Sequence, residues 1–293
     1  MNSSIKSHSD LVTTHQAICA GFLAQAKEKS SKAAPHLKEA KKISALLAKT
    51  NSIESVLQIL PIEDLASAMG FSEKAQNKFS SKELKDLAEE MLKTVFKGAG
   101  KEFREEILYR FLLTRGDTLG GSMRNVTGAM AQRSFTSAIA EALNDKKIKF
   151  QVFKGSEDKV KWIQWTNRTL IFDYKPKFID KNIDVILLKT RVGVSGEIPS
   201  LEDPSFYLCC GELKGGIDPA GADEHWKTAR TALERIRQKF KKDCPHLFFA
   251  ANAIEESMAK EIFNMLCAGE LAYAVNLNNK KQLTELSHWL ITL

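Results

Sequence analysis

The feature that most constrains the fold is a change of sequence pattern near Asn144. Before this point, apolar residues recur at the spacing of one helix face, for example over 37–49 and 82–96. After it come short apolar runs of strand length, with helical stretches between them. A helical region followed by a mixed region suggests two parts. We therefore predict a helical domain over 1–100 and an α/β domain over 101–293, a chain of the α/β (α+β) class.

Proline, serine and glycine residues predict where several helices begin and end. Pro35, Pro61 and the Ser80–Ser81 pair are predicted starts, and Gly98 with Gly100 predicts a stop. A loop over 115–121 is expected to separate two helices. The expected helices lie at 37–49, 53–60, 82–96, 102–114, 123–143, 223–241, 256–267 and 282–290. The expected strands lie at 150–153, 162–165, 169–174, 183–188, 206–213 and 247–253.

The composition is that of an ordinary globular protein with an excess of positive charge. The 293 residues include 43 Lys and Arg against 36 Asp and Glu, a net charge of +7, and 43% of them are hydrophobic. This balance argues against a mainly disordered chain, and no uncharged apolar run is long enough to cross a membrane. The positive charge is a mild sign of an anionic partner, although a basic surface without a function is equally compatible with it.

Cysteine usage and the N-terminus favour a location in a reducing cytoplasm. The five cysteines include no C-x-x-C pair, which argues against both a disulfide framework and a zinc site. The first ten residues are polar and lack an apolar signal core. We therefore expect neither secretion nor a membrane partner.

Three charged residues lie in or at the end of apolar segments with the pattern of buried strands. Asp184 interrupts the run 183–188, and Glu212 and Lys214 end the run that begins at Phe206. A lone buried carboxylate is unfavourable by several kcal/mol unless it is paired or bound to a metal. Because side chains alternate along a strand, Glu212 and Lys214 share a face, and Asp184 can join them if the two strands are neighbours.

Two carboxylates beside a lysine can hold a divalent cation with a positive group nearby. Oxygen ligands suit Mg²⁺, which can acidify a water molecule and neutralise charge on a phosphodiester. The lysine can orient that water or stabilise the pentavalent transition state. This D…(D/E)-x-K pattern is typical of many metal-dependent nucleases. The alternative is a structural ion pair at a strand end.

The bare E-x-K pattern is weak evidence, because it also occurs at 39–41, 83–85 and 157–159. The copy at 83–85 lies in a helical context, where residues two apart do not share a face. Strand context distinguishes the copy at 212–214 from these others.

The segment after Lys214 combines glycines with a histidine at the start of a basic helix. Gly215 and Gly216 let the backbone approach a ligand closely, but the G-K-[S/T] ending of a phosphate-binding P-loop is absent. His225 near the helix start can act as a general base, or it can be an ordinary structural histidine. The basic side of the helix can face phosphates or simply be solvated, and it carries Lys227, Arg230, Arg235, Arg237, Lys239, Lys241 and Lys242.

A second glycine-rich segment, 114–125, contains Arg115, Arg124 and Asn125. We expect a turn at a helix entrance, where backbone N–H groups can bind phosphates and Arg or Asn can read base edges. These three residues are therefore candidate DNA contacts. The alternative is an ordinary helix start that Ser122 caps.

The segments 116–125 (GDTLGGSMRN) and 211–229 (GELKGGIDPAGADEHWKTA), together with Asp184, resemble the AvaI/BsoBI family of type II restriction endonucleases. The likeness runs through most of the chain, and 211–229 is its most specific part. The resemblance implies a restriction-endonuclease-like catalytic core, with a mixed central sheet flanked by helices, and an N-terminal helical domain that embraces DNA. It also implies a Mg²⁺-dependent homodimer that cuts double-stranded DNA at a short palindrome, CYCGRG or similar. The host would be a prokaryote with a cognate DNA methyltransferase that forms no stable complex with this protein.

The resemblance also assigns roles to residues at matching positions. Asp184, Glu212 and the backbone carbonyl of Leu213 would hold the metal. Lys214 would be the catalytic lysine, and His225 would help to activate the attacking water. The positions that face base edges are matched by Lys74, Lys181 and Asp218.

Two departures from the family pattern stand out. Ile183 precedes Asp184 where the name of the PD-(D/E)XK class has proline, and the chain looks shorter than its relatives over about 150–180. The second departure leaves the contacts of that region and the preferred DNA site open. A sequence-specific DNA-binding protein without catalysis and a structure-specific repair nuclease with the same metal core remain as alternatives.

Overall fold

The computed structural model describes residues 3–94, 96–155, 159–190, 201–240 and 243–293. Contacts divide the chain into two compact units. The helical unit is Ala24–Asn125, and the sheet unit combines Met1–Leu23 with Val126–Leu293. Both boundaries lie inside long helices, α1 (His15–Leu47) and α6 (Phe103–Asp145). The predicted boundary at residue 100 falls instead within the helical unit, in the 3₁₀ helix η2 (Phe96–Glu102).

Helix α6 is continuous through 115–121, where the sequence predicted a loop and a new helix start. Phe111, Arg115 and Leu119 follow one another at helical spacing and are all buried, so this face keeps the helix packed. The hydroxyl of Ser122 donates to the carbonyl of Leu119 at 2.8 Å instead of capping a helix. Glycines 116, 120 and 121 face open space, and the helix passes through them at the modest cost of glycine. The predicted loop and cap are therefore wrong.

Pro35 lies inside α1, so the helix start predicted there is also wrong. Proline removes one intrahelical hydrogen bond, and the helix accommodates it at an exposed position. The starts predicted at Pro61 and at Ser80–Ser81 are confirmed. Pro61 precedes α3 (Ile62–Ala68), and Ser80 and Glu83 form a reciprocal cap at the start of α5 (Ser81–Thr94).

The sheet unit is built on a seven-stranded sheet whose strand order follows the sequence. The first five strands pair antiparallel, and the last three pair parallel, so the predicted mixed sheet is confirmed. The strands are β1 (Phe150–Lys154), β2 (Val160–Trp165), β3 (Arg168–Tyr174), β4 (Ile183–Lys189), β5 (Tyr207–Lys214), β6 (His246–Ala251) and β7 (Tyr273–Asn276). The sequence did not predict β7, because its four buried residues show no alternation.

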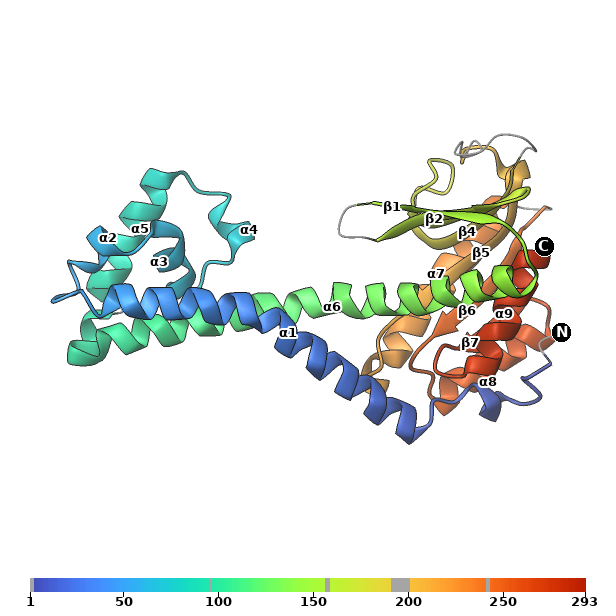
Figure 1. The fold of residues 1–293 in the computed structure, drawn as a ribbon, viewed down its shortest axis with the longest axis horizontal. Coiled ribbons are helices and arrows are strands. Elements are labelled where there is room, and N and C mark those ends of the chain that lie inside the picture. The colour runs from blue at the N-terminus through green and yellow to red at the C-terminus, as the bar shows by residue number, and fades with distance from the viewer. Residues whose placement is uncertain (1–2, 95, 156–158, 191–200, 241–242) are drawn as a thin grey trace. The chain divides into compact units, whose positions relative to one another are not determined.

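Helices cover both faces of the sheet (Figure 1). The C-terminal part of α6 and α9 (Lys280–Thr292) pack on one face, and α7 (Ala222–Phe240) and α8 (Glu256–Cys267) pack on the other. The centre of both contacts is β6, where Phe248 stacks on Phe135 of α6 and Phe249 meets Trp226 of α7. Because β6 is buried on both faces, its sequence is an unbroken apolar run. Lys241, the predicted last residue of α7, lies outside the described residues.

The N-terminal segment belongs to the sheet unit because buried hydrogen bonds tie it to the ends of β6 and β7. The Thr13 N–H donates to the Ile254 carbonyl, and its hydroxyl donates to the Asn252 carbonyl, both at 2.9 Å. The amide of Asn276 donates to the Leu11 carbonyl at 3.0 Å. The 3₁₀ helix η1 (His8–Leu11) precedes this contact. Residues far apart in sequence are thereby joined, which no local pattern could predict.

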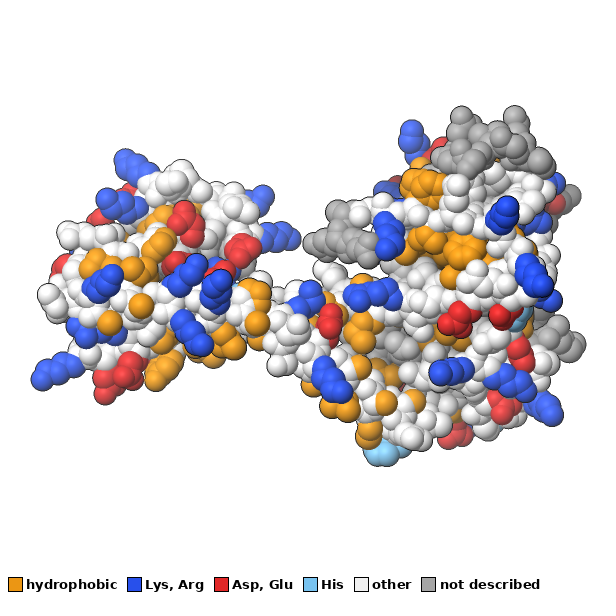
Figure 2. All heavy atoms as spheres, viewed as in Figure 1, with side chains coloured by type: hydrophobic (Ala, Val, Ile, Leu, Met, Phe, Trp, Pro, Cys, Tyr) orange, Lys and Arg blue, Asp and Glu red, His pale blue; other side chains and the backbone are white. Residues whose placement is uncertain are grey.

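The helical unit has a core of its own, which α1, α3, α5 and α6 form with the short helix α2 (Val56–Ile59). Ile43, Leu65, Leu92 and Phe111 lie in this core. A further short helix, α4 (Glu73–Gln76), follows α3. None of the helices in the described part of the chain is both long and apolar enough to cross a membrane. Figure 2 shows Lys and Arg side chains spread over the visible face of each unit, with acidic side chains among them.

Gly215, directly after β5, lies against the backbone of α6. A Cβ atom at this position would lie 2.3 Å from the carbonyl oxygen of Thr127 and 3.0 Å from the Cα of Gly128. Both neighbours are backbone atoms, which cannot move aside as the end of a flexible side chain can. The missing side chain therefore lets α6 and the end of β5 approach each other closely.

We expect Gly215→Ala to lower the free energy of unfolding by about 1–3 kcal/mol, because the methyl group would push two backbone segments apart. The matched control is Gly116→Ala, at an open position inside α6, which should raise the free energy of unfolding by about 0.5–1 kcal/mol. Urea unfolding of both variants measures the two changes. A Gly215→Ala protein as stable as the parent would contradict the close approach.

Candidate active site

Strands β4 and β5 bring Asp184 and Glu212 opposite each other. The antiparallel register pairs Val185 with Gly211, so the next pair along the strands is Asp184 with Glu212. Residues directly opposite in an antiparallel pair point to the same face of the sheet. Two carboxylates placed in this way repel each other, so the pair needs a positive group beside it.

Lys214 supplies a positive group to this pair. Its Nζ lies 2.7 Å from Glu212 Oε2 and 3.0 Å from Asp184 Oδ2. The structure thus brings together the three charged side chains that the strand pattern placed on one face. Glu212 is the most deeply placed, with 4% of its side chain exposed, whereas Lys214 and Asp184 are 20% and 23% exposed. A ligand from solvent would therefore meet Asp184 and Lys214 first.

The charges of the three side chains are strongly coupled. Burial raises the pKa of Glu212 to about 8, and Asp184 adds to this rise while Lys214 opposes it. For Lys214, burial lowers the pKa, but the two carboxylates outweigh it and hold the pKa above its ordinary value. Near neutral pH, Lys214 is therefore charged and Glu212 largely holds a proton. Ionisation of Glu212 would add a negative charge that the single ammonium group of Lys214 does not balance.

The backbone of Leu213 faces the same carboxylates. Its N–H donates to Asp184 Oδ2 at 2.9 Å. In a β-strand the N–H and C=O of one residue point to the same side, so the Leu213 carbonyl also faces β4. Each carboxylate accepts from Lys214 through one oxygen, and Glu212 and Asp184 also lie within hydrogen-bonding reach of each other. Two carboxylates and a carbonyl are the hard oxygen donors that Mg²⁺ prefers.

Asn252, at the end of β6, holds the backbone of Lys214 and Gly215 in place. Its N–H donates to the Lys214 carbonyl, and its side-chain amide donates to the Gly215 carbonyl, both at 3.0 Å. The sequence pattern does not predict this role, because the expected strand 247–253 includes Asn252. A polar residue at the end of an otherwise apolar run was the available signal.

His225 lies in the first turn of α7 and is exposed. A Cβ atom at Gly216 would lie 3.2 Å from its Nε2, so that glycine leaves the space beside the imidazole ring. Gly216 is two residues after Lys214, which brings the ring toward the end of β5. In the described part of the chain, no hydrogen bond or ion pair joins His225 to Asp184, Glu212 or Lys214.

Two of the predicted DNA contacts lie in the sheet unit, at the same edge as the cluster. Lys181 is exposed just before β4, and Asp218 is exposed just after β5. Because these strands are antiparallel neighbours, the start of one and the end of the other lie together. Asp218 also accepts the Ala220 N–H at 3.0 Å and so caps the short helix η5 (Pro219–Gly221).

The other predicted DNA contacts lie in the helical unit. Lys74 is exposed on α4, and Arg124 and Asn125 are exposed on α6. Arg115 differs from them, because it is buried and forms ion pairs with Glu39 and Glu73. The glycine-rich surroundings of Arg115 suggested a ligand contact, and nothing local in the sequence indicated its acidic partners.

The competing E-x-K copies do not lie on described strands. The copy at 39–41 lies in α1, and the copy at 83–85 lies in α5. Residues 157 and 158 of the third copy lie outside the described residues. Among the residues that can be placed, no three His, Cys, Asp or Glu side chains gather into a metal-binding group, so a cation beside Asp184 and Glu212 would need backbone or water ligands as well.

Comparison with known proteins identifies the family. The chain matches the family described as "Restriction endonuclease BsobI" over residues 1–293. It is 40% identical to the type II restriction enzyme AvaI of Nostoc sp., over 99% of this chain and 98% of the relative. It is 38% identical to the type II restriction enzyme BsoBI of Geobacillus stearothermophilus, over 99% of this chain and 97% of the relative. These alignments span 312 and 315 positions, so the 293-residue chain has gaps against both relatives. The chain therefore belongs to the BsobI family of type II restriction endonucleases, which are hydrolases that cleave DNA.

Proposed function

We propose that this protein hydrolyses phosphodiester bonds of double-stranded DNA at a short palindrome, CYCGRG or a close variant, with Mg²⁺ as its cofactor. The observation that carries the proposal is the meeting of Asp184, Glu212 and Lys214 at the ends of two paired strands. The names of the relatives support the DNA-cleaving activity, since they are type II restriction enzymes.

The residues present fit a divalent cation. Asp184, Glu212 and the Leu213 carbonyl would hold the ion. The raised pKa of Glu212, about 8, supports this assignment, because a second positive charge would favour the ionised form of Glu212. Bound there, Mg²⁺ would supply Lewis-acid stabilisation of charge on the scissile phosphate.

Lys214, His225 and Glu212 would have different roles in the hydrolysis. Lys214 is held by two carboxylates and stays charged, so it can stabilise negative charge on a phosphate oxygen during hydrolysis. His225, exposed beside the end of β5, can accept a proton from the attacking water. Glu212 holds its proton near neutral pH unless further positive charge is bound, so its ionisation should depend on the cation.

DNA recognition would use residues of both units. Asp218 and Lys181 lie at the edge of the sheet that carries the cluster, where a carboxylate can accept from a cytosine amino group and a lysine can donate to guanine. Lys74, Arg124 and Asn125 would contribute contacts from the helical unit, which would embrace the DNA. We propose that the sheet unit cuts while both units bind.

The proposed substrate also constrains the assembly and its setting. A palindrome has two-fold symmetry, and a homodimer with the same symmetry would present one active site to each strand. We place the enzyme in the prokaryotic cytoplasm, where its DNA substrate is found. A cognate DNA methyltransferase in the same system, without a stable complex, would protect the host sequence.

We expect Lys214→Ala and Glu212→Ala each to slow the cleavage of plasmid DNA at least about a hundredfold, because the first removes a positive charge that stabilises the transition state and the second removes a ligand of the cation. Binding of a site-containing duplex should change little. Plasmid digestion with Mg²⁺ and a gel mobility-shift assay measure the two properties. The matched control is Lys260→Ala, which removes an exposed lysine that pairs with Glu256 on α8.

Cleavage by Lys214→Ala at the parental rate would overturn the site assignment. The digestion also separates the proposed function from its rivals. Discrete bands indicate a site-specific endonuclease, and a mobility shift without cleavage indicates a DNA-binding protein. Cutting of branched DNA without a preferred sequence indicates a repair nuclease.

We expect the free energy of unfolding of the parent to fall as pH rises, and we expect Glu212→Gln to lack this fall. The folded pKa of Glu212, about 8, lies above the ordinary value of 4.5, so the folded chain keeps a proton that the unfolded chain releases. Between these two pKa values, each pH unit therefore lowers the free energy of unfolding of the parent by up to about 1.4 kcal/mol. Urea unfolding in chelator across this pH range measures the difference, with Glu141→Gln as an exposed control on α6. Parallel pH profiles for the parent and Glu212→Gln would contradict the raised pKa.

We expect two chains on each site-containing duplex. Sedimentation of the Lys214→Ala protein with such a duplex in solution measures the stoichiometry without cleavage. A single chain on the duplex would argue against the homodimer, and it would leave the second DNA strand without an active site.

A further inference from the structure

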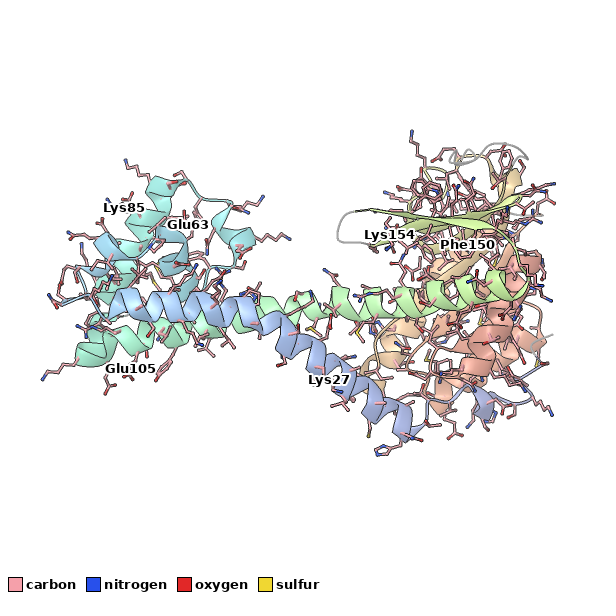
Figure 3. All side chains as sticks on the ribbon, in the orientation of Figure 1. Lys27, Glu63, Lys85, Glu105, Phe150 and Lys154 are labelled. Atoms are coloured by element: carbon pink, nitrogen blue, oxygen red, sulfur yellow. The ribbon has the colours of Figure 1, made fainter. Side chains whose placement is uncertain are left out.

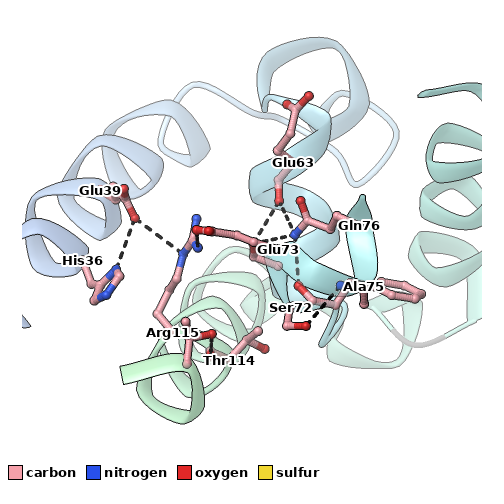
Figure 4. A network of polar contacts seen from close by, with 12 residues as sticks. His36, Glu39, Glu63, Ser72, Glu73, Ala75, Gln76, Thr114 and Arg115 are labelled. Carbon is pink, nitrogen blue, oxygen red and sulfur yellow. Dashed lines mark hydrogen bonds and ion pairs between the residues drawn. The ribbon is translucent and has the colours of Figure 1, made fainter. Parts of the chain in front are cut away.

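Arg115 of α6 is the centre of a polar network inside the helical unit (Figure 4). Its Nη1 lies 2.5 Å from Glu73 Oε1 on α4, and its Nε lies 3.5 Å from Glu39 Oε2 on α1. The guanidinium also lies 5.2 Å from the centre of the Phe111 ring. Only 10% of the Arg115 side chain is exposed. The group therefore joins three helices and is poorly placed to bind a phosphate from solvent.

A need for stability alone does not explain why ion pairs, and not apolar residues, occupy this position. Removing a guanidinium from water is unfavourable, and apolar residues of similar volume often stabilise a fold as well or better. Arg115 donates a hydrogen bond to Glu73 and lies at ion-pair distance from Glu39. A charge-assisted hydrogen bond does what an apolar contact cannot do, because it fixes the direction in which Glu73 lies. The partners here are Glu39, on a long helix, and Glu73, on the four-residue helix α4.

Helix α4 is anchored from its other end as well. The side-chain amide of Gln76 is buried and donates to the Phe71 carbonyl at 2.9 Å, to the Ser67 hydroxyl at 3.0 Å and to the Glu63 carbonyl at 3.2 Å. Glu63 is the α3 residue labelled in Figure 3. The Ser72 hydroxyl accepts the Ala75 N–H and caps the helix. A single helical turn has little stability of its own, so these contacts decide where α4 lies.

Lys74 lies between these two anchors, but unlike Gln76 it is not buried. It is exposed, and within the described part of the chain it has no ion pair or hydrogen bond, although Glu73 beside it is paired. A lysine has a long flexible stem, so the base that it reaches depends on the position of its backbone. The position of the Lys74 backbone depends on Glu73 on one side and Gln76 on the other.

We infer that Arg115 is a positioning residue, which fixes α4 through Glu73 and thereby directs Lys74 to a base edge of the DNA. The inference rests on the proposed function, and in particular on the contact between Lys74 and DNA. It assigns Arg115 an indirect role in place of the direct DNA contact that the sequence suggested.

The test compares Arg115→Gln, Lys74→Ala and the double variant, each in the full-length chain. The DNA site is first defined by sequencing the ends of digested DNA. Binding is then measured in chelator, with a duplex that contains this site and with a scrambled duplex of the same composition. Arg110→Gln is the matched control, since it removes an exposed ion pair with Glu106 from the same helix. Thermal unfolding of every variant is recorded alongside.

Each single variant should bind the site-containing duplex more weakly, on the order of tenfold, which is the usual effect of losing one base contact. The affinity of the double variant should be within about twofold of that of Lys74→Ala, because Arg115 acts only through Lys74. Affinity for the scrambled duplex and the salt dependence of binding should stay unchanged. Arg110→Gln should leave all of these quantities unchanged.

Several results would overturn the inference. Additive losses in the double variant would show that Arg115 and Lys74 act independently. A salt slope lower by about one unit for Arg115→Gln would show that Arg115 touches a phosphate itself. Equal losses on both duplexes, with a lower unfolding temperature, would show a purely structural role. If Arg115→Gln does not fold, Arg115→Lys replaces it with the same expectations, because lysine keeps the charge but lacks the rigid planar guanidinium that holds Glu73 in one direction.

Failure of the inference can be told apart from failure of the proposed function. If the parent prefers no duplex over another and cuts no plasmid, the proposed function is wrong. If the parent prefers its site and Lys74→Ala binds it equally well, the Lys74 contact is wrong, and the role of Arg115 falls with it.

Discussion

The candidate site depends on the burial of two facing carboxylates beside a single lysine. The register of β4 and β5 places Asp184 opposite Glu212; burial of Glu212, and after it the repulsion from Asp184, raise the pKa of Glu212 to about 8. Lys214 relieves this repulsion only in part, since one ammonium group faces two carboxylates. Under the proposed function, this site would bind a further cation and would release a proton when the cation binds.

The rest of the sheet unit holds the cluster at a fixed place on β5. This strand pairs antiparallel with β4 and parallel with β6, so its end lies where the direction of pairing changes. Asn252 donates to the carbonyls of Lys214 and Gly215, and Gly215 lets α6 lie close to the end of β5. Little backbone freedom remains around Lys214, which favours a charged group that is already in place before DNA binds.

The sequence predicted the parts of this structure that local pattern determines. The strands that carry Asp184 and Glu212 were expected from their apolar runs, and the shared face of Glu212 and Lys214 followed from the alternation of a strand. Contacts between residues far apart in sequence could not be predicted from these patterns. The tie from Thr13 to Ile254 and the pairing of Arg115 with Glu73 join residues that no spacing connects. Glycines near position 120 suggested a turn, yet burial of one face kept α6 helical, so packing outweighed intrinsic preference.

The measurement that tests the central claim most directly is the release of protons when Mg²⁺ binds to the protein without DNA. Calorimetric titration near pH 7, in two buffers with different ionisation enthalpies, gives the number of protons released for each ion. We expect close to one proton from the parent, because Glu212 holds a proton until the cation arrives. Glu212→Gln should release none. Binding without proton release by the parent, or equal release by the parent and Glu212→Gln, would contradict the account of Asp184, Glu212 and Lys214 as one coupled cation site.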